Sequence, residues 1–367
     1  MPHDRFAARR DRLLRRLKTA NVDALLVTSP VNVRYLTGFT GEDSDLIIGR
    51  NLTVLVSDSR FETQVSEECS SVEAHIRSTA QTLTEAVAQV VAGAKLSALG
   101  FESRSTSYSQ WESLTTAVKP LQLAPQIDQV ETLRLIKDAD EVTQIREAIH
   151  QAERGFALLK ASLRGEMSEL QAANELEHAM RRFGARQASF ETIVAAGRRA
   201  ALPHARPTSA RIGEADLLLI DWGATNGQGY HSDLTRVLST GTISPKLEKL
   251  HGVVLSAQRK AIEAIRPGIR AAKVDAIARD FIAKAGWGKN FGHGLGHGIG
   301  LEIHEGPRIS RISHDILKAG MVVTVEPGVY LPGWGGIRIE DDVLVTRNGH
   351  EVLSSLPRGF DGQETSL

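Results

Sequence analysis

The sequence predicts two domains, an N-terminal α/β domain followed by a larger α+β domain. The chain has 367 residues, which is more than one hydrophobic core usually serves. Short apolar strands alternate with helical segments up to about Pro125, a pattern typical of α/β domains. Beyond it, helices come in runs and strands come in runs, as in α+β domains. We place the boundary so that the domains span residues 1–128 and 129–367.

The composition is that of an ordinary globular protein, with 41% hydrophobic and 24% charged residues. Because 44 basic residues balance 44 acidic ones, nothing favours nucleic acid or an anionic membrane as a partner. Cys69 is the only cysteine, which excludes an internal disulfide and a cysteine-based zinc site. No apolar run approaches the roughly 18 residues of a membrane span. We expect a cytoplasmic protein.

The N-terminal domain is predicted to begin with an amphipathic helix, since Phe6, Leu13 and Leu17 fall at helical spacing. Asp4 and Asp11 interrupt the basic charge of this stretch, which argues against a targeting segment. Residues 31–39 are interpreted as a structured turn. Apolar alternation then predicts strands at 23–28, 45–49, 52–57, 72–77 and 96–102, and helices at 61–69, 82–94 and 108–119.

The second domain is predicted to contain four helices, at 138–163, 168–184, 245–265 and 271–285. Its clearest strands are "ETIVAA" (191–196), "DLLLID" (216–221), "MVVTVEP" (321–327) and "GIRIEDDVLVT" (336–346). The segment "FGHGLGHGIGLEIHEGP" (291–307) holds three histidines and six glycines. Glycine adds no side chain to the packing, and histidine is a common metal ligand, so the segment indicates backbone that approaches a ligand.

Four carboxylates occur in or beside the apolar strands: Asp221, Asp233, Glu326 and Glu340. A buried carboxylate is costly unless it is paired or binds metal. One such residue would most often be a structural ion pair or a cap. Four of them, together with a histidine of the glycine-rich segment, favour a metal site.

Two aspartates, two glutamates and one histidine suit a pair of divalent ions. Oxygen-rich ligation favours manganese, cobalt or iron, and zinc without thiolate ligands stays open. Other motifs fail: Arg308 stands where HExxH requires histidine, and the glycines match neither GxGxxG nor a P-loop.

Six motifs occur in one order along the second domain, and together they resemble the pita-bread metallopeptidases. They are "LPH", "DWGA", "SDLTR", "GHGIGLEIHEGP", "TVEPGVY" and "GIRIEDD". This family includes Xaa-Pro aminopeptidases, prolidases and methionine aminopeptidases. "NVRYLTGFTG" and "DSRF" resemble the creatinase-type N-terminal domain. The resemblance covers nearly the whole chain, and it implies a creatinase-like α/β domain joined to a pita-bread α+β domain.

The resemblance implies a role for each of the five metal ligands. Asp221 binds the first metal, and Asp233 and Glu340 bridge the two ions. His297 and Glu326 complete the second metal. Asp221 and Asp233 are 12 residues apart, one more than is usual in the family, which places an extra residue in the loop "GATNGQG".

The resemblance also implies a substrate site. His204 and His304 would bind the scissile carbonyl and its developing charge, and Glu326 would shuttle the proton. Strand alternation places Arg338 on the same side as Glu340, where the arginine would orient a ligand carboxylate. Without the resemblance, His204 reads as a capped loop residue and Arg338 as a surface arginine.

Other charged residues near these motifs keep two interpretations. Arg308 could clamp a substrate carboxylate or form a surface salt bridge. Arg198 and Arg199 stand where relatives usually carry small polar residues, and they either charge the pocket entrance or are solvated. His293 is interpreted as a residue that shapes the pocket.

The predicted function is hydrolysis of the bond between an N-terminal residue and a following proline, as by Xaa-Pro aminopeptidases. The alternative is an Xaa-Pro dipeptidase (prolidase) with the same site. Methionine aminopeptidases are disfavoured, because they generally lack this N-terminal domain. A metal-free creatinase-like amidinohydrolase and a non-catalytic binding module remain alternatives from other classes, although all five ligands argue against both. The resemblance implies proline-containing peptides as substrates, two divalent ions per chain with manganese preferred, and a homodimer.

Overall fold

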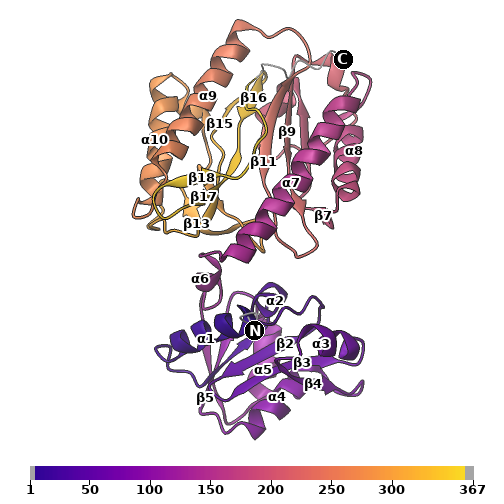
Figure 1. Cartoon of the computed structure of the whole chain (residues 1–367), viewed down its shortest axis with the longest axis vertical. Helices are drawn as coiled ribbons and strands as arrows, with labels where there is room; N and C mark the ends of the chain where they lie inside the picture. The colour runs from indigo at the N-terminus through magenta and orange to yellow at the C-terminus, as the bar shows by residue number, and fades with distance from the viewer. Residues whose placement is uncertain (1–4, 360–367) are drawn as a thin grey trace. The chain divides into compact units, whose positions relative to one another are not determined.

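The structure, a computed structural model, describes residues 5–359. The described residues fall into two compact units that divide between Arg134 and Leu135 (Figure 1). Within this range no helix is both long and apolar enough to cross a membrane.

The N-terminal unit is built on one six-stranded mixed sheet with the strand order β4-β3-β2-β1-β5-β6. Strand β2 pairs antiparallel with β1 and β3, and the remaining pairs are parallel. The strands are β1 (Ala24–Val27), β2 (Asp45–Gly49), β3 (Leu52–Asp58), β4 (Glu73–Arg77), β5 (Ala98–Glu102) and β6 (Gln122–Gln126). The helices are α1 (Arg5–Leu17), α2 (Pro30–Thr37), α3 (Glu62–Glu68), α4 (Leu83–Gly93), α5 (Tyr108–Ala117) and α6 (Glu131–Arg134).

Helix α2 corrects one sequence prediction, because residues 31–39 were expected to form a turn. Pro30 occupies the first helical turn, where its missing N–H costs no hydrogen bond. Gly38 ends the helix with φ of 86°, in the left-handed region that glycine tolerates. The prediction was wrong because it took Ser29-Pro30 only as the end of a strand, whereas the pair also begins a helix.

The C-terminal unit contains two helix pairs that flank antiparallel sheets (Figure 1). Its helices are α7 (Ala139–Ser162), α8 (Glu169–Arg182), α9 (Pro245–Ala264) and α10 (Ala271–Lys284), with short 3-10 turns η1 (Gly197–Ala201), η2 (Ile212–Glu214) and η3 (Gly288–Asn290). Asp138, Ser168 and Ser244 each cap a helix by accepting a backbone N–H with the side chain. All four predicted helix starts match the structure to within a residue, and these caps explain three of them.

Two sheets carry most of the C-terminal unit. One has the order β11-β9-β8 and the other β13-β12-β14-β17-β18, and two-stranded sheets β10-β7 and β15-β16 complete the unit. The strands are β7 (Gln187–Ala188), β8 (Ile193–Ala196), β9 (Leu217–Trp222), β10 (Ala224–Thr225), β11 (Leu234–Ser239), β12 (Gly296–Gly298), β13 (Glu305–Ile309), β14 (Val322–Val325), β15 (Gly328–Leu331), β16 (Gly335–Arg338), β17 (Asp341–Val345) and β18 (His350–Val352).

The predicted strand 336–346 is in fact two strands, β16 and β17, interrupted at Ile339 and Glu340. Strand β16 pairs with β15, whereas β17 pairs with β14. The backbone N–H of Glu340 donates instead to the carbonyl of Thr235 in β11, at 3.2 Å. The interruption therefore joins the two main sheets at Glu340, and it places that carboxylate between them.

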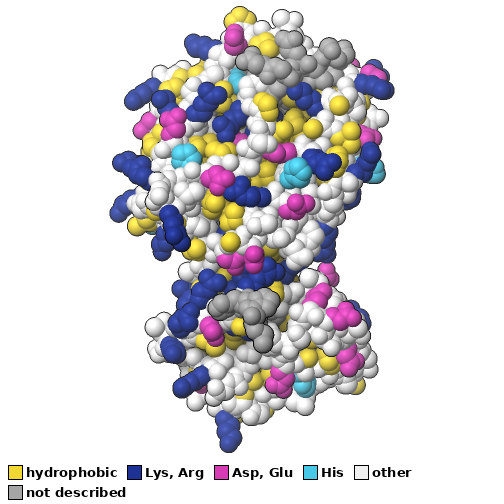
Figure 2. All heavy atoms as spheres, viewed as in Figure 1, with side chains coloured by type: hydrophobic (Ala, Val, Ile, Leu, Met, Phe, Trp, Pro, Cys, Tyr) yellow, Lys and Arg dark blue, Asp and Glu magenta, His cyan; other side chains and the backbone are white. Residues whose placement is uncertain are grey.

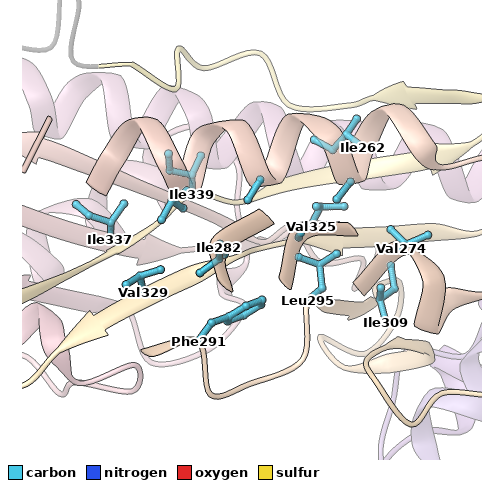
Figure 3. Packing of buried hydrophobic residues seen from close by; sticks show 14 of the residues in the cluster. Ile262, Val274, Ile282, Phe291, Leu295, Ile309, Val325, Val329, Ile337 and Ile339 are labelled. Carbon is cyan, nitrogen blue, oxygen red and sulfur yellow. The ribbon is translucent and has the colours of Figure 1, made fainter. Parts of the chain in front are cut away.

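The hydrophobic core of the C-terminal unit packs each helix pair against its sheet. Figure 3 shows side chains of α9 and α10, such as Ile262 and Ile282, against Val325, Val329 and Ile337 of the strands. A second cluster joins α7 and α8 to β8, β9 and β11, and in it the rings of Phe156 and Trp222 stack with centroids 4.3 Å apart. All six residues of β9 are buried, so both of its faces are covered.

The surface carries mixed charge. On the face that Figure 2 shows, basic and acidic side chains are interspersed over the C-terminal unit. This pattern agrees with the balanced composition. On this face no extended patch of positive charge would attract a polyanion such as nucleic acid.

Candidate active site

All eight residues predicted for the site line one cavity of about 730 Å³ in the C-terminal unit: His204, Asp221, Asp233, His297, His304, Glu326, Arg338 and Glu340. Asp221 lies in β9, His297 in β12, and Asp233 directly precedes β11. Glu326 follows β14, and Glu340 separates β16 from β17. Strands of both main sheets thus converge on the cavity.

The metal-ligand candidates form a compact group on the cavity wall. Ligand atoms of Asp233, His297 and Glu340 all lie within 4.8 Å of one another. Nε2 of His297 is 3.5 Å from Oδ2 of Asp233 and 3.5 Å from Oε1 of Glu326. Asp221 is held differently, because its Oδ2 accepts a hydrogen bond from the guanidinium of Arg338.

Two buried carboxylate oxygens in this group, Oδ1 of Asp221 and Oε1 of Glu340, have no hydrogen-bond partner among residues 5–359. An unsatisfied buried carboxylate oxygen is expensive, since the charge has lost its water. A divalent cation would remove that cost. Four carboxylates with one imidazole are hard and borderline ligands that fit such cations. The residues present therefore fit a metal centre.

Electrostatics support the same interpretation. Burial, followed by the neighbouring carboxylates of Glu340 and Asp221, raises the pKa of Asp233 well above its ordinary value. Burial, followed by Glu326 and Asp221, does the same to the pKa of Glu340. Burial and Asp221 raise the pKa of Glu326 to about 8. The carboxylates repel one another in a desolvated place, so positive charge would stabilise them.

The imidazole of His297 is a candidate metal ligand in its neutral form. Burial, with His304 and Arg308 nearby, lowers the pKa of His297 to about 4. Its Nδ1 lies 3.1 Å from the carbonyl oxygen of Gly298, which leaves Nε2 facing the carboxylates. Thr324 receives a hydrogen bond from the backbone N–H of His297 at 3.1 Å, and this contact fixes the residue further.

A second layer of polar residues orients the carboxylates. The hydroxyl of Thr235 donates to Oε2 of Glu340 at 2.6 Å and accepts from Nε of Arg338 at 3.1 Å. Arg338 also donates to the hydroxyl of Tyr330 at 2.7 Å. The sequence prediction assigned no role to Thr235, Thr324 or Tyr330. Their only signal was membership of the quoted motifs.

Four histidines line the cavity, and two of them, His204 and His304, are exposed. The ring of His304 lies 4.4 Å from that of His297, measured between centroids. Burial and Arg308 lower the pKa of His304. Nε2 of His293 is 3.0 Å from the hydroxyl of Tyr330, so His293 is a fixed part of the cavity wall. His204 lies between η1 and η2 and also lines the cavity.

Two expectations about neighbouring residues can be compared with the structure. The loop "GATNGQG" ends in a turn in which Oδ1 of Asn226 accepts the N–H groups of Gln228 and Tyr230. The extra residue therefore leaves Asp233 in the cavity. Arg199 does not charge the entrance, since its Nε pairs with buried Glu169 at 2.9 Å.

The glycines of the glycine-rich segment serve close backbone packing. A Cβ at Gly296 would lie 2.1 Å from the carbonyl oxygen of Thr324, and one at Gly298 would lie 1.9 Å from that of Gly306. Strand β12 can pass between β13 and β14 only because these residues lack side chains. Gly294 and Gly296 also line the cavity, so the predicted close approach to a ligand stays a prediction.

Comparison with known proteins identifies the family. The model of metallopeptidase family M24 matches residues 143–347, and the creatinase/prolidase N-terminal domain matches residues 9–136. The Xaa-Pro dipeptidase of Pyrococcus horikoshii is 35% identical over 92% of this chain and 94% of that protein.

Solved structures agree. The Xaa-Pro dipeptidase from Bacillus anthracis superimposes with a TM-score of 0.93 at 36% identity, covering 96% of this chain and 99% of that one. The X-Pro aminopeptidase from Thermotoga maritima gives a TM-score of 0.87 at 36% identity, covering 94% and 99%. The chain belongs to metallopeptidase family M24. It is a metal-dependent hydrolase with a creatinase-like N-terminal domain and a pita-bread catalytic domain.

Proposed function

We propose that this protein is an Xaa-Pro dipeptidase, which hydrolyses dipeptides with proline in second place. The sequence alone favoured an aminopeptidase and kept the dipeptidase as the alternative. The relatives named Xaa-Pro dipeptidase support the alternative. The X-Pro aminopeptidase among the similar structures keeps the first interpretation as the second candidate.

The observation that carries the proposal is the position of Arg308. Its exposed side chain lines the same cavity as the carboxylate group and His304. Within residues 5–359 the guanidinium has no ion-pair partner, so the surface salt bridge considered from the sequence is not formed there. A free guanidinium can form an ion pair with the C-terminal carboxylate of a dipeptide. In a longer peptide that carboxylate lies farther from the scissile bond.

We further propose that Asp221, Asp233, His297, Glu326 and Glu340 hold two divalent ions, with manganese the preferred metal. Oxygen-rich ligation by four carboxylates and one imidazole supports this choice. When bound, such ions supply Lewis acidity and lower the pKa of water. A homodimer remains part of the proposal on the ground of family resemblance.

The residues of the chain would divide the work of hydrolysis. His204 and His304 bind the scissile carbonyl oxygen and stabilise its negative charge as the water oxygen adds to the carbonyl carbon. Glu326 moves the water proton to the proline nitrogen while the C–N bond breaks. Arg308 binds the substrate carboxylate, and Arg338 keeps Asp221 oriented.

A substrate panel tests the proposal. The purified protein with manganese is assayed on an Xaa-Pro dipeptide, the same dipeptide as its C-terminal amide, and a tripeptide with proline second. We expect the free dipeptide to have the highest kcat/KM. Arg308→Ala should raise KM for the dipeptide by roughly 10–100-fold, the loss of a charge-assisted pair, and change kcat little.

Arg311→Ala is the matched control, because Arg311 is exposed three residues away and does not line the cavity. Preference for the tripeptide, with no effect of Arg308→Ala, would favour the aminopeptidase. No cleavage of any proline peptide would refute both candidates.

A further inference from the structure

We propose that Glu169 is a positioning residue, which fixes the segment 197–207 and thereby the imidazole of His204 in the cavity. This inference rests on the proposed function, in which His204 binds the scissile carbonyl. Glu169 lies outside the cavity, so it would act through the segment and not through contact with substrate.

The carboxylate of Glu169 is fully buried and binds both ends of the segment. Oε1 accepts the backbone N–H of Ala196 at 2.9 Å, directly before the segment begins. Oε2 accepts the backbone N–H of Thr208 at 2.9 Å and its hydroxyl at 2.7 Å, directly after the segment ends. One side chain therefore closes a loop of eleven residues at its base.

Arg199 extends this clamp into the segment. Its Nε donates to both oxygens of Glu169, at 3.0 and 2.9 Å. Its terminal nitrogen donates to the carbonyl oxygen of Arg206 at 2.6 Å. Arg199 thus ties the first part of the segment to the last part, and His204 lies two residues before Arg206.

The start of helix α8 strengthens the same connection. Glu169 is the first residue of this helix, and its own N–H donates to the carbonyl of Ala210 at 3.0 Å. The next N–H, of Leu170, donates to the carbonyl of Thr208 at 3.0 Å. These donors have no partner inside a helix, so the segment satisfies them. The segment is fastened to α8 by its backbone as well as by the carboxylate.

His204 needs such support, because its side chain forms no hydrogen bond with any residue between 5 and 359. Only its backbone neighbours are held, for example where Arg338 donates to the carbonyl of Pro203 at 3.2 Å. The position of the imidazole therefore follows the position of the segment. A displacement on the order of 1 Å from a remote change can lower a rate by about 100-fold.

The test is a double-mutant cycle with an independent structural measurement. Glu169→Gln, Arg199→Met, His204→Ala and the double variant Glu169→Gln/His204→Ala are compared in the manganese-loaded full chain. Glu169→Gln keeps the shape of the side chain, but it replaces one accepting carboxylate oxygen with an amide NH₂ group, which cannot accept from the N–H donors. We expect it to lower kcat roughly 10–100-fold with KM little changed. In the His204→Ala background it should lower kcat by less than about twofold.

Hydrogen–deuterium exchange of peptides covering 197–208 provides the readout that does not need activity. Exchange should accelerate in Glu169→Gln and Arg199→Met, and it should not change in Glu175→Gln, an exposed glutamate of the same helix. Arg199→Met removes only one of the hydrogen-bond partners of Glu169. It therefore tests the inference if Glu169→Gln does not fold.

Two results would overturn the inference. In the first, the losses in kcat of the two single variants multiply in the double variant. This result would indicate that Glu169 acts independently of His204. The other is unchanged exchange of the segment in both variants. If the wild type cleaves no proline peptide, the proposed function fails, and the exchange measurement alone decides whether Glu169 holds the segment.

Discussion

Thr235 contacts two residues that lie more than 100 positions away from it in the sequence. Its hydroxyl donates to Glu340, 105 residues away, and accepts from Arg338. The same arginine binds Asp221. One hydroxyl and one guanidinium therefore orient carboxylates from both main sheets, and metal affinity should depend on them.

Thr235→Val removes the hydroxyl and keeps the shape of the side chain. We expect the affinity for manganese to fall roughly 10–100-fold, as when the outer partner of a metal ligand is lost. Glu340→Gln should weaken binding further, because it removes a ligand. Competition with a chelating dye measures both changes. Thr53→Val, in a strand of the N-terminal unit, is the control, and unchanged affinity in Thr235→Val would contradict the role of the hydroxyl.

The sequence could predict the acidic residues of the site, because Asp221, Glu326 and Glu340 stand in apolar strands where a charge is conspicuous. It could not predict the support around them. Thr235 and Glu169 have no unusual local pattern, and their roles arise from contacts with segments far along the chain. Such contacts depend on the tertiary fold, which periodicity does not reveal.

Among the elements, β12 shows most clearly how glycine serves the site. The strand carries His297 between two residues whose Cβ atoms would collide with carbonyl oxygens of β14 and β13. The glycines therefore hold the histidine by letting three strands approach closely.

Gly296→Ala should destabilise the protein by about 1–3 kcal/mol or more, because the added Cβ would lie 2.1 Å from backbone that cannot move freely. Gly292→Ala, in the same segment, has no atom within 4 Å and should leave stability nearly unchanged. Urea unfolding of both variants measures the difference. Equal stabilities would show that close packing does not explain these glycines.

At the end of β3, Asp58 accepts hydrogen bonds from Nε and the backbone N–H of Arg60, both at 3.0 Å. Arg77 donates to the same carboxylate at 3.0 Å. The hydrogen bonds from Arg60 hold the pKa of Asp58 at about 2. The folded state therefore favours the charged form, and this stabilisation exists above the unfolded pKa of roughly 4.

Asp58→Asn should lower the thermal midpoint at pH 7 by on the order of a few degrees. The difference from the wild type should shrink as the pH falls from about 4 to about 2, because the wild-type carboxylate then takes up a proton. Calorimetry at several pH values measures it. Asp43→Asn removes a more exposed partner of Arg60 and serves as the control. A difference that stays constant down to pH 2 would contradict the assignment.

Helices and strands with strong local signals were predictable, and two exceptions have clear reasons. Asp138 and Ser168, the first residues of two predicted helices, cap these helices in the structure. The sequence analysis predicts a turn at residues 31–39, whereas Pro30 begins a helix there. The sequence analysis predicts a continuous strand at 336–346, because the break at Glu340 follows from pairing with β11 and has no local signal.

For the whole molecule, the order of helices and strands and the motifs predict the two-domain α/β plus α+β architecture. Family membership confirms it. The choice between dipeptidase and aminopeptidase was not predictable in the same way. It depends on which group meets the far end of the substrate, and the sequence leaves two interpretations open for Arg308, the residue proposed for that contact.

The central claim is that five side chains from both main sheets hold a pair of divalent cations that serve peptide hydrolysis. Anomalous diffraction at the manganese edge, from crystals grown with manganese, tests it most directly. We expect two peaks within the cavity, among Asp221, Asp233, His297, Glu326 and Glu340. A cavity without peaks, or a single peak in a preparation that cleaves Xaa-Pro dipeptides at its full rate, would contradict the claim.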